Sequence, residues 1–194
     1  IENHRNHGQV DGCRQFFRVI LTRDDLEAVE RDMRKAGLFS FHVTASSERP
    51  CDSTIIGLAI ATSEQACYYI PLAHSYLEAP EQLTLDDIRK TLGPVFCDSA
   101  VKKTAFDLKQ MRLYLHFAGI PVSGFAPDPM VITHILDSSR KVDLNMMSEG
   151  YIKYSPMDLT AVRRNSKETF DKIEIDTWKD YACERAMIFL RLHR

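Results

Sequence analysis

Short runs of bulky and β-branched residues dominate the first 71 positions of the chain, and helical patterns dominate the rest. The runs predict strands at 16–21, 38–44, 54–61 and 66–71. Glu64 and Gln65 fall between the last two runs, where a turn is expected. This close spacing predicts that the last three strands pair as an antiparallel meander.

Capping residues mark the helices. Thr22 precedes a segment with early acids and late bases, and Gly37 follows it, so a helix is predicted at 23–36. Further helices are predicted after Thr84, at 108–118 after Asp107, after Asp128, and over 143–151 and 175–192, with one short strand at 103–106. Strands followed by helices predict an α/β domain with a mixed sheet. The polar residues 1–14 indicate a linker, which leaves 15–194 as the domain.

The segment "LFSFHVTASSE", residues 38–48, is an apolar strand that ends in small polar groups. Alternation places Phe39 and Phe41 on one face and His42 and Thr44 on the other. Polar groups at the end of a buried strand are typical of an active-site edge. Glu48 follows at the end of this segment, but the strand itself carries no carboxylate.

Two predicted helices carry unusual residues on their inward stripes. In the last helix Arg185 shares a stripe with Trp178, Tyr181, Ile188 and Leu192. A buried, unpaired arginine is costly, so Arg185 either extends to the surface or pairs with an acid. In the helix after Asp107, Met111 lies on the apolar stripe and is expected to point inward.

Composition argues against several classes of protein. A net charge of −2 argues against a dedicated nucleic-acid binder, and no apolar run has membrane-spanning length. The five cysteines lack zinc spacing and indicate free thiols in a reducing cytoplasm. The polar start without methionine indicates a fragment. Hydrolase and nucleotide-binding motifs are absent from the sequence. His74 is expected to be structural or exposed. One of the two adjacent tyrosines, Tyr68 and Tyr69, is expected to pack in the core and the other to be half exposed.

Three segments carry a family resemblance: "YYIPLAHSYLEAPEQLT" at 68–84, "SGFAPDPMVITHILD" at 123–137 and "DYACERA" at 180–186. Together they resemble the 3′–5′ proofreading exonuclease domain of bacterial DNA polymerase I, in the DEDDy group of the ribonuclease H-like superfamily. The resemblance implies a ribonuclease H-like mixed β-sheet flanked by helices.

The resemblance also locates the family's metal site, in which four carboxylates hold two divalent ions. Those four positions fall on His42, Thr44, Met111 and Arg185, and the tyrosine that orients water falls on Tyr181. The implied function is a catalytically inactive exonuclease-like domain with a structural or DNA-positioning role. It would bind no metal or cofactor itself, with Mg²⁺ confined to a polymerase domain outside this sequence. Its implied partners are DNA and that adjacent domain, without a membrane and in the cytoplasm.

Two alternatives remain open. The first is an active nuclease with a rearranged site, for which the candidate acids are Glu48, Asp52, Asp107, Asp128 and Glu184. The second is a module that binds single-stranded nucleic acid weakly, through Lys102, Lys103, Lys109, Arg112, Arg163, Arg164 and Lys167. These basic residues could equally form a solvated charged face.

Overall fold

The fold centres on one mixed sheet of five strands. The computed structural model describes residues 14–136, 138, 142–163, 165 and 168–193. The strands are β1 (Phe17–Val19), β2 (Leu38–Ala45), β3 (Ile55–Ser63), β4 (Ala66–Pro71) and β5 (Lys102–Thr104), in the spatial order β1-β4-β3-β2-β5. The pairs β2–β3 and β3–β4 are antiparallel, which confirms the predicted meander. The two outer strands run parallel to their neighbours.

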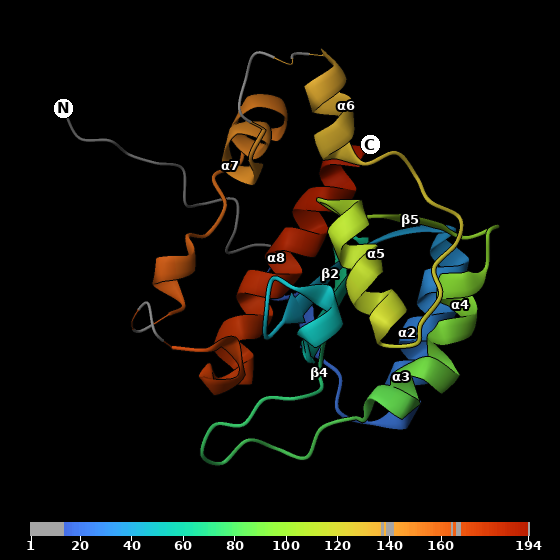
Figure 1. Cartoon of the computed structure of the whole chain (residues 1–194), viewed down its shortest axis with the longest axis vertical. Coiled ribbons are helices and arrows are strands. Elements are labelled where there is room, and N and C mark those ends of the chain that lie inside the picture. The colour runs from blue at the N-terminus through green and yellow to red at the C-terminus, as the bar shows by residue number, and fades with distance from the viewer. Residues whose placement is uncertain (1–13, 137, 139–141, 164, 166–167, 194) are drawn as a thin grey trace.

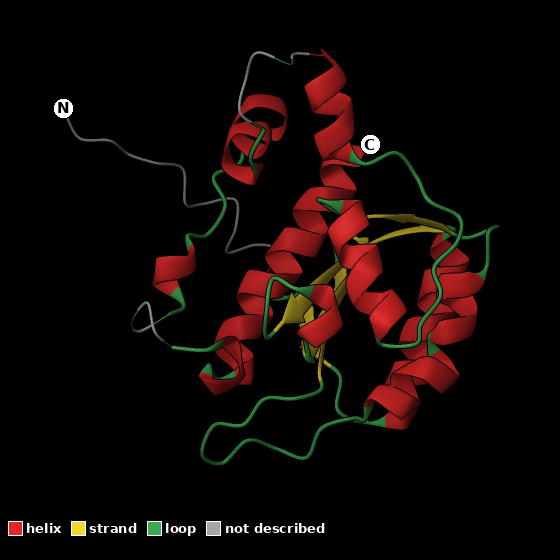
Figure 2. Ribbon diagram, in the orientation of Figure 1, coloured by secondary structure: helices red, strands yellow, loops and turns green. Residues whose placement is uncertain are grey.

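Helices cover both faces of this sheet (Figures 1 and 2). They are α2 (Arg23–Ala36), α3 (Leu85–Thr91), α4 (Gly93–Cys97), α5 (Leu108–Phe117), α6 (Pro129–Leu136), α7 (Leu144–Met147) and α8 (Ile175–His193). Shorter turns lie at η2 (Pro50–Asp52), η3 (Ser148–Ile152), η4 (Leu159–Ala161) and η5 (Phe170–Lys172). Within the described part of the chain, no helix is both long and apolar enough to cross a membrane.

The sheet separates two hydrophobic cores. One contains side chains of α2 to α5 together with Phe39, Phe41 and Val43 of β2. The other is built mainly by α8 against β3 and β4. On β2 the opposite face meets α8: the Ser40 hydroxyl donates to the carbonyl of Ala186. The predicted alternation of β2 is therefore confirmed.

Local capping explains where α2 begins and ends. The Thr22 side chain accepts a hydrogen bond from the Asp25 amide, and Gly37 adopts a left-handed conformation with φ 68°. Glycine tolerates this conformation, in which its amide closes the helix on Arg34. The helix predicted at 23–36 is confirmed.

Some local predictions differ from the structure. Tyr68 and Tyr69 are both buried, because the Tyr68 hydroxyl reaches under α2 and donates to Asp32 at 2.5 Å. The strand predicted at 103–106 lies at 102–104, because Phe106 turns away to stack on Phe189. The helix predicted at 143–151 divides into α7 and the wider turn η3. Of the predicted linker, residues 1–13 lie outside the described residues.

Candidate functional site

A pocket of about 290 Å³ opens where β2 ends, with α5 and α8 on its sides. It is lined by His42, Val43, Thr44, Ala45, Ser46, Ser47, Glu48, Met111, Tyr114, Phe170, Trp178, Tyr181 and Arg185. The set includes all five positions that the family resemblance marked, which come from three separate elements. The fold thus brings together residues more than 140 positions apart in the sequence.

β2 contributes His42 and Thr44. The His42 ring packs edge-on against Phe189, and its Nδ1 is buried with no hydrogen-bond partner among the described residues. Burial lowers the pKa of His42 to about 3, and the positive charge of Arg185 contributes to this lowering. The ring is therefore neutral near pH 7. Thr44 is buried, and its hydroxyl accepts a 2.8 Å hydrogen bond from the indole nitrogen of Trp178.

α5 contributes Met111, whose side chain is buried as predicted. Its sulfur lies 3.3 Å from the backbone nitrogen of Val43 and accepts that hydrogen bond. A thioether is a soft and weak acceptor, so it suits this amide better than it suits a hard divalent cation.

α8 contributes Arg185, and the structure shows which groups this arginine contacts. Its Nη1 lies 3.4 Å from a carboxylate oxygen of Glu184, and its Nη2 donates to the carbonyl of Met157 at 3.1 Å. The guanidinium carbon stands 3.4 Å from the centre of the Tyr181 ring. Only 12% of the side chain is exposed, so Arg185 pairs with an acid and does not extend into solvent.

Glu184 is almost completely buried beside Arg185. One carboxylate oxygen accepts from the Tyr154 hydroxyl at 2.5 Å, and the other accepts from the Met157 amide at 2.8 Å. Burial raises the pKa of Glu184, and the hydrogen bonds from Tyr154 and Met157 oppose that rise. Both oxygens of the Glu184 carboxylate are therefore hydrogen-bonded to groups of the protein itself.

The other candidate acids differ in their positions and contacts. Glu48 lines the pocket, whereas Asp52 is exposed in η2. Asp107 accepts from the Gln110 amide at the start of α5. Asp128 accepts from the amides of Leu108 and Met130, the first from α5 and the second from α6. Among the described residues, no three His, Cys, Asp or Glu side chains are placed to hold a metal ion. The residues of this pocket therefore do not fit a two-metal centre.

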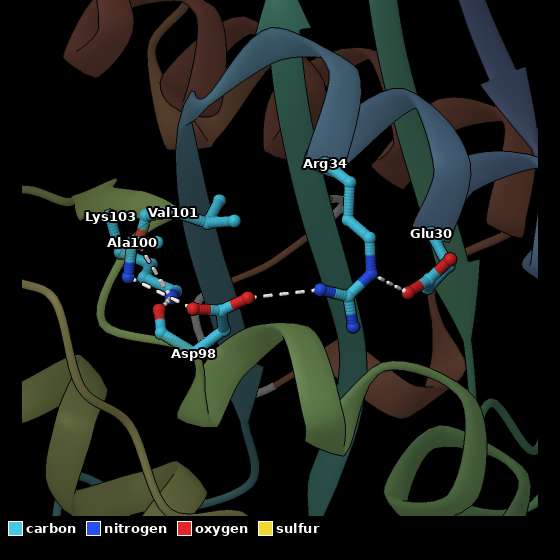
Figure 3. A network of polar contacts seen from close by, with 6 residues as sticks. All are labelled: Glu30, Arg34, Asp98, Ala100, Val101 and Lys103. Atoms are coloured by element: carbon cyan, nitrogen blue, oxygen red, sulfur yellow. Dashed lines mark hydrogen bonds and ion pairs between the residues drawn. The ribbon is translucent and has the colours of Figure 1, made fainter.

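Lys103 is not available for binding a ligand, contrary to prediction. It is fully buried, and its amino group donates to the carbonyls of Asp98 and of Val101, the latter at 2.7 Å (Figure 3). Burial lowers the pKa of Lys103 to about 8. The Asp98 carboxylate accepts a hydrogen bond from the Arg34 guanidinium of α2 at 3.0 Å. The contacts of Arg34, Asp98 and Lys103 therefore join α2 to the loop before β5.

The remaining basic candidates differ in their surroundings. Lys102, Lys109 and Arg112 are exposed, and Arg112 lies over the Phe125 ring at 5.2 Å. Arg163 is half-buried, lies over the Phe170 ring and donates to the Glu168 carbonyl at 2.6 Å. Arg164 and Lys167 lie outside the described residues.

Several pocket residues escaped prediction. Tyr114 follows Met111 by three positions on α5, so helical spacing could have identified it. Phe170 stacks on Trp178 at 4.8 Å, but it comes from an irregular segment without periodicity. His74 is structural, one of the two outcomes expected: it is buried between the Tyr69 hydroxyl at 2.7 Å and the Ile173 carbonyl at 3.0 Å.

Solved structures place this fold in a known class. The chain matches RNase D of Trypanosoma brucei with a TM-score of 0.74 and 14% identity, over 91% of this chain and 63% of that one. It matches the structure described as the POL domain of Pol1 from M. smegmatis with a TM-score of 0.67 and 17% identity, over 90% and 26% of the two chains. The mixed sheet and its helices are those of the RNase D-like, ribonuclease H-like fold.

Sequence comparison then shows the family. A family model described as 3′–5′ exonuclease matches residues 17–194, and the chain belongs to this family. DNA polymerase I of Pseudomonas aeruginosa is 30% identical over 92% of the chain, and that of Rhizobium leguminosarum is 27% identical over 89%. The chain spans 20% and 19% of the lengths of these two relatives. It is a 3′–5′ exonuclease domain of the DNA polymerase I type.

Proposed function

We propose that this domain retains the exonuclease fold without hydrolysing DNA. It serves a longer DNA polymerase I-type chain as a structural element that supports the adjacent polymerase domain and positions DNA in cytoplasmic replication and repair. Mg²⁺ chemistry belongs to the polymerase domain. The observation that carries the proposal is the convergence of His42, Thr44, Met111 and Arg185 in one pocket.

The charge of the pocket supports this reading. By the family resemblance, these four positions would supply carboxylates for two divalent cations. Here His42 is neutral, Thr44 and Met111 carry no charge, and Arg185 is a cation. Hard divalent ions need several oxygen ligands, and a guanidinium repels them. Glu48 is the one carboxylate among the lining residues given above, and one carboxylate cannot hold two such ions.

The contacts of these residues support it as well. Thr44 binds Trp178, Met111 binds the Val43 amide, and Arg185 binds Glu184 and Met157. Each side chain therefore cross-links elements of the fold at a position where an active member would hold metal.

The test uses the full-length chain with 3′-labelled single-stranded DNA and Mg²⁺ or Mn²⁺. An active proofreading exonuclease serves as the positive control, and Tyr181→Phe serves as the site control. We expect no metal-dependent release of mononucleotides. Release by the wild type that Tyr181→Phe abolishes would overturn the proposal. Release that persists in Tyr181→Phe would point to another source of the activity.

Weak binding of single-stranded DNA is a second candidate function. It is favoured by the exposed Lys102, Lys109 and Arg112 and by the aromatic rings at the pocket. Such binding requires no metal, and its affinity falls with salt because phosphate contacts release counterions. Fluorescence anisotropy with labelled oligonucleotides at several salt concentrations tests it, and an affinity independent of salt would exclude it.

A further inference from the structure

Two consecutive side chains of α8 hold both backbone polar groups of one residue. Glu184 accepts a hydrogen bond from the Met157 amide at 2.8 Å, and Arg185 donates one to the Met157 carbonyl at 3.1 Å. The two side chains also contact each other at 3.4 Å. A rigid helix thus fixes Met157 at two points, although this residue lies in a segment of irregular backbone.

A third contact fixes the other end of the same segment. The Tyr154 hydroxyl donates to Glu184 at 2.5 Å, and the Tyr154 ring is buried in the core formed by α8. Residues 154–157, which we call the strap, are therefore bound to α8 at both ends. Pro156 lies between these attachments and restricts the backbone further.

We propose that Glu184 and Arg185 clamp the strap against α8 and that the closed strap holds the Arg185 guanidinium in the pocket, over the ring of Tyr181. The contact keeps a fixed cation beside the tyrosine that the family resemblance marks as a site residue. This inference deepens the proposed function and rests on it for the meaning of Tyr181. The clamp itself rests on the hydrogen bonds alone.

Burial makes the clamp cooperative. Glu184 is 1% exposed and Arg185 12% exposed, so neither charge finds full hydration if its partner leaves. Opening the strap removes the Met157 amide and the Tyr154 hydroxyl from Glu184 and the Met157 carbonyl from Arg185. Because groups in one buried network support one another, loss of one member weakens the others.

Hydrogen–deuterium exchange on the full-length chain, read by mass spectrometry over residues 154–157, tests the clamp. We expect Arg185→Met to accelerate exchange of the Met157 amide at least tenfold. Arg191→Met is the matched control, because Arg191 lies on the same helix and pairs with Glu64 at 3.5 Å near the surface. This control is expected to change the exchange of the strap less than twofold.

A milder variant keeps the test decisive if Arg185→Met does not fold. Tyr154→Phe removes one hydrogen bond from the same carboxylate, and we expect it to accelerate Met157 exchange severalfold. Unchanged exchange in Tyr154→Phe, or an equal effect of Arg191→Met, would overturn the clamp. DNA hydrolysis by the wild type would overturn the proposed function and leave the exchange result standing, so the two failures are distinguishable.

Discussion

The hydrogen bond between Trp178 and Thr44 connects α8 to the end of β2, inside the pocket. Both residues are 2% exposed, and the indole nitrogen lies 2.8 Å from the threonine hydroxyl. Thr44→Val replaces that hydroxyl with a methyl group of nearly the same size. The substitution therefore creates little cavity and leaves the indole N–H without its acceptor.

The cost follows from this geometry. Leaving a buried donor unpaired costs about 1–3 kcal/mol. Burial raises the pKa of Tyr69, and the Thr44 side chain opposes that rise, so the substitution also changes the surroundings of Tyr69. For a chain of this size, a loss of 2 kcal/mol corresponds to a Tm lower by about 4–8 °C. Thr44→Ser keeps the hydroxyl and is expected to lose less stability.

Thermal unfolding followed by tryptophan fluorescence measures the effect. Trp178 is the single tryptophan of the chain, so its emission reports on this site alone. We expect Thr44→Val to lower Tm and shift the emission of the folded protein, and Thr44→Ser to leave the emission unchanged. An unchanged Tm together with an unchanged emission in Thr44→Val would refute the reasoning.

Three further predictions test other parts of the structure. The folded-state pKa of His42 is about 3, below its ordinary 6.5, so the wild type should lose stability as the pH falls from 6.5 toward 3. The stability of His42→Leu, measured by urea unfolding, should depend less on pH, and parallel profiles of the two proteins would contradict the assigned burial. In Gly57→Ala the new Cβ would lie 2.1 Å from the Tyr69 hydroxyl, so urea unfolding should show a free energy of unfolding lower by about 2–4 kcal/mol. Gly93→Ala, whose new Cβ would have nothing within 4 Å, should leave that free energy unchanged, and equal effects of the two variants would count against the clash. If the second candidate function holds, Lys109→Ala and Arg112→Ala should each reduce the slope of log affinity for single-stranded DNA against log salt by about one. Arg31 of α2 is also exposed, and Arg31→Ala should leave the slope unchanged; a slope unaffected by all three variants would exclude these contacts.

Local sequence was sufficient wherever the determining interaction is itself local. The Thr22 cap, the turn at Gly37 and the alternation along β2 each depend on neighbouring residues, so the elements they predict are present. Predictions failed where a distant element decides the outcome. Tyr68 is buried because α2 covers it. Lys103 is buried because β5 lies between Phe39 of β2 and Phe125.

The sequence by itself determined the strand–helix order, the inward stripe of α8 and the resemblance that singles out His42, Thr44, Met111, Tyr181 and Arg185. Only the tertiary structure decided that these residues share one pocket and what each of them binds. The partners of Arg185 show the difference, since Glu184 is its neighbour in sequence but Met157 comes from an irregular segment 28 positions away. A one-dimensional pattern specifies which face a side chain occupies. The partner that compensates a buried charge depends on chain segments brought together by the packing of the whole domain.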